Sequence, residues 1–477
     1  MKRTISLWWI LACAALPACT RPDVVGDAGP KLPVVAAQAP APHLVALEVA
    51  PVDRFVEAGK PAALEVRVRL AVEPITGGKR TPANLALAVD TSGSMEGQAI
   101  ADARAACLTM VETLVDGDRV AIVTFGSTAE VLVPSTVLDA TSRAAVRDRI
   151  AAMQARGTTN MAAGLEAALA EVRSHAEEPR IHRMVVVSDG VPNDSSRLAG
   201  LAEEAGATGV GITTLGLGLD YDETLLASIA KASGGKFHFV RESAEVATLL
   251  EKEVLRMQRT VGRGVVLELV AGPGVRISEV VGYALEPAPG GVRVALGDVS
   301  EEETRDVIVK VGLPARSAGS HVEVLDAALR YDDAVVGGGA VEEHAFLGVH
   351  ATADKAELGA GHDAAVELGA ARASVASLVL YAIASARAGE LTRAQATLER
   401  AEALARERGR ALHDAELEAR AGEMPALRAS LATLLPAQPV AGAMDRPGAP
   451  VAAPPTPESA ELVRAAHAAA VESLQGR

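Results

Sequence analysis

The sequence of 477 residues is poor in aromatic side chains, which make up only 2% of it. It therefore offers few of the flat rings on which bases or sugars stack. Positive charge is also scarce, because 46 lysines and arginines stand against 61 aspartates and glutamates, for a net charge of −15. Such a balance disfavours nucleic acid as a partner, since phosphate binding needs a cationic face. Three cysteines are too few for a disulfide scaffold.

Familiar catalytic signatures are missing as well. The sequence contains no G-x-x-x-x-G-K-[ST] phosphate loop, no G-x-S-x-G nucleophile elbow and no H-E-x-x-H zinc helix. Hydrophobic residues account for 49% and charged residues for 22%, the mixture of a folded globular protein. At roughly 150 residues per domain, the length predicts about three folding units. Together these features favour a folded protein that is not an enzyme.

The N-terminus predicts export. Lys2 and Arg3 precede an apolar stretch over residues 5–16. This stretch is shorter than the about 20 residues that a membrane-spanning helix needs, so it is typical of a secretory signal peptide. We expect the signal peptide to cover residues 1–18.

The next residues resemble a bacterial lipobox, Leu16-Pro17-Ala18-Cys19. The resemblance implies that Cys19 is lipidated and anchors the protein to the cell envelope, since more than one acyl chain gives a stable anchor. Thr20 after the cysteine implies the outer membrane. Two alternatives stay open, namely lipidation at Cys13 and an ordinary signal peptide without lipidation.

Strand and helix patterns alternate between residues 84 and 258. The run 85–89 is apolar throughout and the run 181–188 is strongly apolar, as expected for strands buried on both faces of a sheet. Apolar residues recur at helical spacing from Ile100 to Leu114, and Cys107 on this face is predicted to pack in the core. The alternation predicts an α/β fold with a doubly wound, mostly parallel sheet.

Polar side chains follow the predicted strands at the carboxyl ends, where such sheets bind ligands. Asp90, Ser92 and Ser94 follow the first strand, and Asp189 follows residues 181–188. Thr159, with Thr158 as a weaker alternative, lies in the loop before another helix. These five oxygen donors predict a hard divalent cation, with Mg²⁺ favoured by the low carboxylate count and Mn²⁺ or Ca²⁺ possible. The competing interpretation is that Ser94 or Thr159 only caps a helix.

The pattern Asp90-x-Ser92-x-Ser94, Thr159 and Asp189 resembles the metal-ion-dependent adhesion site of the von Willebrand factor type A domain. The resemblance implies that the hydroxyls coordinate the metal directly or through water. It also implies a protein-binding, adhesion-type module, in which an acidic side chain of a partner protein completes the metal site. The alternative function is a structural or regulatory subunit of an envelope complex, with the metal site serving assembly.

Alternating patterns on both sides of this region predict one antiparallel β-sandwich into which the type A domain is inserted. The arrangement resembles bacterial proteins related to inter-α-inhibitor. The expected organisation is a signal peptide over 1–18, a lipidated Cys19 and Pro-rich tether over 19–42, sandwich strands over 43–76, a type A domain over 84–258, further sandwich strands over 261–350, a helical hairpin region over 351–435, a Pro/Ala linker over 436–457 and a terminal helix over 458–477.

Overall fold

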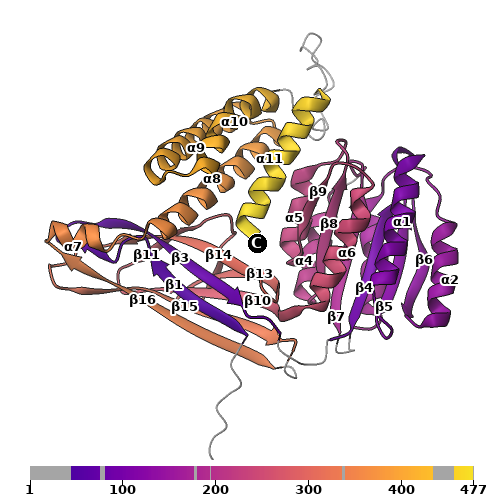
Figure 1. The fold of residues 1–477 in the computed structure, drawn as a ribbon, viewed down its shortest axis with the longest axis horizontal. Helices are drawn as coiled ribbons and strands as arrows, with labels where there is room; N and C mark the ends of the chain where they lie inside the picture. The colour runs from indigo at the N-terminus through magenta and orange to yellow at the C-terminus, as the bar shows by residue number, and fades with distance from the viewer. Residues whose placement is uncertain are drawn as a thin grey trace, which may run out of the picture. The chain divides into compact units, whose positions relative to one another are not determined.

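The computed structural model describes residues 44–75, 81–176, 180–193, 195–335, 339–432 and 456–475. The predicted signal peptide, Cys19 and the Pro-rich tether lie outside the described residues, as does most of the predicted linker. Within the described part, the chain forms an α/β region with a central sheet, two further sheets and a set of C-terminal helices (Figure 1).

The central sheet has six strands in the order β6-β5-β4-β7-β8-β9. Five of them run parallel, and β6 pairs antiparallel with β5 at one edge. The predicted doubly wound, mostly parallel sheet is therefore confirmed. The strands are β4 (Ala83–Asp90), β5 (Arg119–Phe125), β6 (Ala129–Val137), β7 (Ile181–Ser188), β8 (Gly211–Leu217) and β9 (Phe237–Val240).

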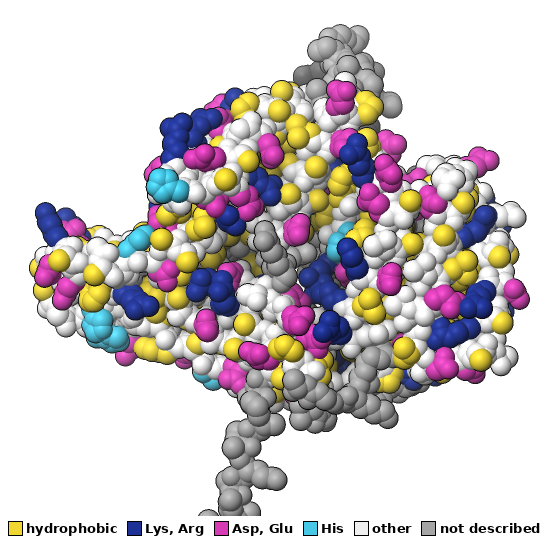
Figure 2. All heavy atoms as spheres, in the orientation of Figure 1, with side chains coloured by type: hydrophobic (Ala, Val, Ile, Leu, Met, Phe, Trp, Pro, Cys, Tyr) yellow, Lys and Arg dark blue, Asp and Glu magenta, His cyan; other side chains and the backbone are white. Residues whose placement is uncertain are grey.

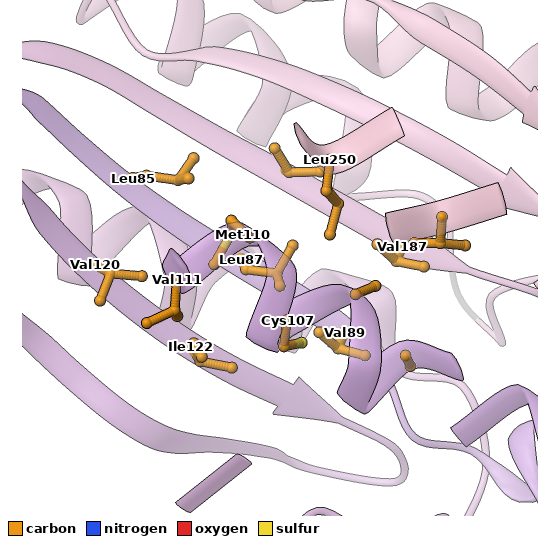
Figure 3. Packing of buried hydrophobic residues seen from close by; sticks show 14 of the residues in the cluster. Leu85, Leu87, Val89, Cys107, Met110, Val111, Val120, Ile122, Val187 and Leu250 are labelled. Carbon is orange, nitrogen blue, oxygen red and sulfur yellow. The ribbon is translucent and has the colours of Figure 1, made fainter. Parts of the chain in front are cut away.

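Helices cover both faces of this sheet. Alternate side chains of β4 enter different cores, with Leu85 and Leu87 on one face and Ala86 and Ala88 on the other. Cys107 is buried in the first core among Leu85, Leu87 and their neighbours (Figure 3), which confirms its predicted packing role. The first core uses α1 (Gln98–Thr113), α2 (Ala140–Ala151) and α6 (Glu245–Gln258), and the second uses α3 (Met161–Arg173), α4 (Leu198–Ala207) and α5 (Glu223–Ser233).

The other two sheets share one hydrophobic core and form a β-sandwich. One sheet has the order β1-β3-β14-β11, in strands β1 (Val45–Pro51), β3 (Ala62–Val72), β14 (Thr304–Leu313) and β11 (Arg276–Val280). The other has the order β12-β13-β10-β15-β16-β2, in strands β12 (Glu286–Ala288), β13 (Gly291–Ser300), β10 (Thr260–Ala271), β15 (His321–Asp333), β16 (Ala340–Thr352) and β2 (Phe55–Glu57).

Strands from both sides of the central α/β region contribute to this sandwich. β3 precedes that region in the chain and pairs antiparallel with β14, which follows it. Its inward residues Leu64, Val66, Val68 and Leu70 are buried, as their alternation with charged residues predicts. One pair departs from the predicted antiparallel arrangement, because the short strand β2 pairs parallel with β16.

The C-terminal region contains more helix than the predicted hairpin. It consists of α7 (Lys355–Ala360), α8 (Ala364–Arg387), α9 (Leu391–Leu412), α10 (Ala415–Leu431) and α11 (Pro457–Gln475). The predicted helical C-terminal region is confirmed, but α10 is a further long helix beyond the predicted hairpin, and it carries Pro425 in its interior. α8 is long and apolar enough to cross a membrane by length and composition, but half of its apolar window is buried within the protein, as in a core helix.

The terminal helix α11 packs against α8 and also reaches the type A region. Arg464 of α11 donates to the backbone oxygen of Tyr221 at 2.9 Å, and its guanidinium lies 5.2 Å from the centre of that ring. In addition, Arg387 at the end of α8 forms a buried ion pair with Glu223 of α5 at 2.6 Å. These contacts fix α11 and α8 against α5.

Candidate metal centre

Three loops meet at the carboxyl ends of β4 and β7, which are parallel neighbours in the sheet. The first follows Asp90 at the end of β4, the second precedes α3, and the third follows Ser188 at the end of β7. Backbone hydrogen bonds hold the first two loops together, from Gly93 to the oxygen of Gly157 at 3.0 Å and from Arg156 to the oxygen of Thr91 at 2.5 Å. The parallel pairing of the strands thus brings together segments about 100 residues apart.

Hydrogen bonds connect four of the five predicted ligand residues in a chain that runs from Asp90 through Ser92 and Ser94 to Asp189. Ser92 Oγ lies 3.0 Å from Ser94 Oγ, and Ser94 Oγ donates to Asp189 Oδ1 at 2.9 Å. The backbone N–H of Ser92 donates to Asp90 Oδ1 at 2.9 Å, while Ser188 Oγ donates to Asp90 Oδ2 at 2.7 Å. The two strand ends are therefore joined by a continuous set of hydroxyl and carboxylate oxygens.

The threonine of the middle loop also lies at this edge. Thr159 is buried, and its Oγ1 would come within 3.1 Å of a Cβ placed on Gly190. Gly190 thus leaves room for the hydroxyl next to Asp189. The hydroxyl of Thr158 lies instead 3.3 Å from Ser127 Oγ at the exposed side of the loop. Of the two threonines, the structure brings Thr159 close to the other candidate ligands.

Helix capping does not account for these hydroxyls. The N-cap of α1 is Gly97, and the N-cap of α3 is Asn160, whose side chain accepts from the backbone N–H of Ala163. Ser92 stands at the N-cap of the short 3-10 helix Gly93–Met95, yet its side chain forms no capping hydrogen bond there. Ser94 and Thr159 cap neither α1 nor α3, so the competing interpretation of the sequence is wrong for both helices.

Of the two carboxyl groups, that of Asp90 is buried and that of Asp189 is half-buried. Burial raises the pKa of Asp90 above its ordinary value, although hydrogen bonds from Ser92 and Ser188 oppose this. Burial also raises the pKa of Asp189 to about 6, and the like charges of Asp90 and Asp220 add to the effect. Within the described ranges, no lysine, arginine or histidine forms an ion pair with either aspartate.

This set of donors fits a hard divalent cation. Two carboxylates and three hydroxyls supply oxygen ligands, and no counterion for their negative charge is found among the residues that the structure describes. Softer metals would need sulfur or imidazole ligands. The described residues contain no group of three or more His, Cys, Asp or Glu side chains arranged to hold a metal.

Two residues near the site were given no role at the metal centre from the sequence. Ser188 orients Asp90, and its only sequence signal is its place directly before Asp189. Asp220 lies close enough to Asp189 to raise the pKa of that carboxyl. It belongs to the loop after β8, which the sequence places at the same edge of the sheet but marks with no motif.

Comparisons with solved structures agree with this architecture. A von Willebrand factor type A protein from Catenulispora acidiphila superposes with a TM-score of 0.66 at 20% identity, covering 91% of this chain and 97% of that one. The ArnB paralogue VWA2 from Sulfolobus acidocaldarius superposes with a TM-score of 0.54 at 16% identity, covering 90% and 98%. At these identities the likeness shows the fold alone.

Sequence relatives and a family model complete the comparison. An uncharacterised protein of Synechocystis sp. is 24% identical over 298 residues, which is 60% of this chain and 70% of that protein. The uncharacterised protein YfbK of Escherichia coli is 28% identical over 200 residues, 40% of this chain and 34% of that protein. The model of the von Willebrand factor type A domain matches residues 84–252. This part of the chain is therefore a von Willebrand factor type A domain.

Proposed function

We propose that the protein is a divalent-cation-dependent protein-binding module with a metal-ion-dependent adhesion site. Asp90, Ser92, Ser94, Thr159 and Asp189 would hold Mg²⁺, with Mn²⁺ or Ca²⁺ as substitutes. The observation that carries the proposal is the meeting of two carboxyl groups, one buried and one half-buried, with three hydroxyls at one edge of the sheet, where neither carboxyl forms an ion pair within the described part of the chain. Type A domains commonly take part in protein–protein interaction and adhesion, which agrees with this role.

An acidic side chain is the partner chemistry that suits such a site. A hard cation held by few protein carboxylates keeps coordination positions for further oxygen ligands. A Glu or Asp side chain of a partner supplies both an oxygen and a negative charge. The exposed position of Ser94 and the partly exposed Asp189 leave the site open on one side. The inter-α-inhibitor-like architecture, in which strands from both flanks build one sandwich, would present this edge on a rigid support.

A binding role is favoured over a catalytic one by the surroundings of the serines. A serine nucleophile needs a base within hydrogen-bonding reach. Among the described residues, Ser92 and Ser94 bond to each other, to Asp90 through the backbone and to Asp189, and no histidine contacts either hydroxyl. We therefore propose no enzymatic activity for this site.

The metal part of the proposal is tested by isothermal titration of the metal-free protein with Mg²⁺. The matched variants are Thr159→Ala and Thr158→Ala, which remove neighbouring hydroxyls of the same loop. Thr159→Ala should weaken Mg²⁺ binding by at least about tenfold, and Thr158→Ala should leave it unchanged. Equal effects of the two substitutions, with melting temperatures unaltered, would overturn the assignment.

The partner is tested by crosslinking on intact cells followed by mass spectrometry, with and without EDTA. The expected result is a set of partner proteins that disappears with EDTA and returns with Mg²⁺. Partners that persist in EDTA and with Asp90→Ala would contradict a metal-dependent contact.

The sequence further supports anchoring to the cell envelope, in the outer membrane, through a lipid on Cys19. Replacing this residue, as Cys19→Ser, should move the protein from the membrane fraction to the soluble fraction, because two or more acyl chains give the stable attachment. Cys13→Ser serves as the matched control. A membrane-bound Cys19→Ser protein would show that the anchor lies elsewhere.

A further inference from the structure

A cavity of about 510 Å³ lies where three parts of the described chain meet. Its walls come from α5, β8 and α6 of the type A domain, from β11, β13 and β14 of the sandwich, and from α8 and α11. None of the five candidate metal ligands lines it. The volume falls in the range of about 300–1,000 Å³ that small-molecule sites occupy, and such sites are frequent where domains meet.

One end of the cavity carries more positive than negative charge. Lys236, Arg256 and Arg305 line it together with Glu253. Glu303 accepts from Arg256 at 2.9 Å and from Arg305 at 2.5 Å. Burial opposes ionisation of both glutamates, but the neighbouring cations and, for Glu253, a hydrogen bond from His238 lower each pKa to about 2. Three cations thus share two ionised carboxylates.

Several polar groups in this lining lack a full set of partners. Lys236 Nζ lies 3.7 Å from Glu303, which is beyond hydrogen-bonding distance. Arg305 Nε, Thr224 Oγ1 and His467 Nδ1 are buried and have no hydrogen-bond partner among the described residues. Arg305 and His467 are only 5% and 3% exposed. Buried polar groups left without partners are costly, so their concentration around one cavity points to a polar ligand group.

Other parts of the lining are apolar. Leu296 contributes from the sandwich, Leu380 and Ala384 from α8, and Val471 and Leu474 from α11. Val471 and Leu474 are largely buried in the protein even though they face the cavity. A ligand that fills the cavity would therefore place an apolar body between α8 and α11 and a polar group against the cations.

The cavity is accessible from solvent. Tyr381, whose side chain is 51% exposed, and the exposed Lys231 both belong to its lining. Lys231 is held there by a hydrogen bond to the backbone oxygen of Gly282 at 2.7 Å. Figure 2 shows Lys or Arg, Asp or Glu and His side chains together near the centre of the face in view.

We propose that this cavity binds an amphipathic carboxylate, meaning an unbranched or lightly branched apolar chain that ends in a single carboxylate group. The carboxylate would lie against Lys236 and Arg305. Its negative charge would offset the excess of cations, and its oxygens would accept hydrogen bonds from donors such as Arg305 Nε that have no partner among the described residues. The apolar chain would lie along α8 and α11. The site is separate from the metal centre and independent of the proposed adhesive function.

The test is isothermal titration of the purified full chain with dodecanoate, dodecanol and dodecylamine, each below its micelle concentration. Dodecanoate should bind at least about tenfold more tightly than dodecanol, and dodecylamine should be the weakest of the three. Shortening the acid to octanoate should weaken binding by about fourfold for each CH₂ removed, as expected for burial of the chain. Binding should persist in EDTA, which separates this result from any failure of the metal proposal.

Two variants locate the site. Lys236→Met should weaken dodecanoate binding at least about tenfold and leave dodecanol unchanged, whereas the matched control Lys252→Met, on the exposed side of α6, should alter neither. Ala384→Phe should weaken both ligands, because the larger side chain fills the apolar end. Melting curves check that each variant is folded. Equal affinity for the three head groups, absence of dodecanoate binding, or binding unaffected by both variants would each overturn the proposal.

Discussion

Two sets of carboxyl groups that lie partly or fully out of solvent have opposite electrostatic surroundings in this protein. At the edge of the central sheet, Asp90 and Asp189 contact hydroxyls, and burial raises the pKa of both. At the contacts between the type A domain and its neighbours, Glu223 and Glu303 contact arginines, which lower the pKa of each despite burial.

The difference shows how one chain uses buried charge for two purposes. Where an arginine accompanies the carboxylate, the charge is neutralised within the protein and the contact is structural. Where only hydroxyls surround it, neutralisation must come from a proton or from an external cation. The sheet edge is therefore suited to a metal, whereas the internal pairs need none.

The largest effect on stability is expected when the arginine of a buried ion pair is removed. Arg387→Met should lower the free energy of unfolding by about 3–5 kcal/mol, because Glu223 is fully buried and loses its 2.6 Å partner. Chemical denaturation measures the change. Arg393→Met, which removes an exposed arginine of α9, is the control and should change stability by less than about 0.5 kcal/mol. A loss as small as that of the control would show that the pair is not essential.

Lowering the pH should reduce stability through the carboxylates that are paired with cations. Glu253 and Glu303 have a folded pKa of about 2, below the ordinary 4.5, so the folded state binds fewer protons than the unfolded chain between these values. Their contribution, at most about 3 kcal/mol each, is present above pH 4.5 and is lost as the pH falls toward 2. Denaturant midpoints measured from pH 6 to pH 2.5 would record the loss. A flat profile over this range would contradict the assignment.

A smaller effect is expected from Ser188, which contacts Asp90 but is not among the proposed ligands. Ser188→Ala removes the 2.7 Å hydrogen bond that orients the carboxylate. Mg²⁺ affinity, measured by titration calorimetry, should fall about 10- to 100-fold, as for other residues that support a ligand. Ser127→Ala, at the exposed side of the neighbouring loop, should leave the affinity unchanged, and a loss there of the same size would refute the role given to Ser188.

The smallest expected effect concerns the stability of the metal-free protein after a substitution at the candidate metal centre. Asp189→Asn removes a carboxyl group whose pKa is raised to about 6, so its ionisation at pH 7.5 costs the folded state more than it costs the unfolded chain. The metal-free variant should therefore be more stable than the wild type by about 1 kcal/mol, while its Mg²⁺ binding is lost. Thermal melts in EDTA measure the first change. Destabilisation in EDTA would mean that the carboxylate is already compensated within the protein.

The sequence allows the metal edge to be predicted because its determinants are local. Asp90 and Asp189 follow directly after apolar strands, and parallel strands end at the same edge of a sheet. The sequence also favoured Thr159 over Thr158, and the loop conformation separates their hydroxyls, since only that of Thr159 lies next to Gly190.

The contacts between the parts of the chain could not be predicted in this way. Arg464 meets Tyr221 across 243 positions, and Arg387 meets Glu223 across 164. Arginines and glutamates are common on the exposed faces of helices. The sequence therefore does not distinguish these buried, paired side chains from solvent-exposed ones. The apolar face of α11 is made mostly of alanine and gave no sign of where it would pack. The cavity lies between these parts of the chain, so it could not be predicted from the sequence either.

The most direct test of the metal centre is anomalous scattering from crystals of the protein grown with Mn²⁺. The account predicts one strong peak at the carboxyl ends of β4 and β7, within about 2–2.6 Å of oxygens from Ser92 and Ser94. It also predicts that the peak disappears from Thr159→Ala crystals. Fully occupied Mn²⁺ at another place, or none at this edge at saturating concentration, would contradict it.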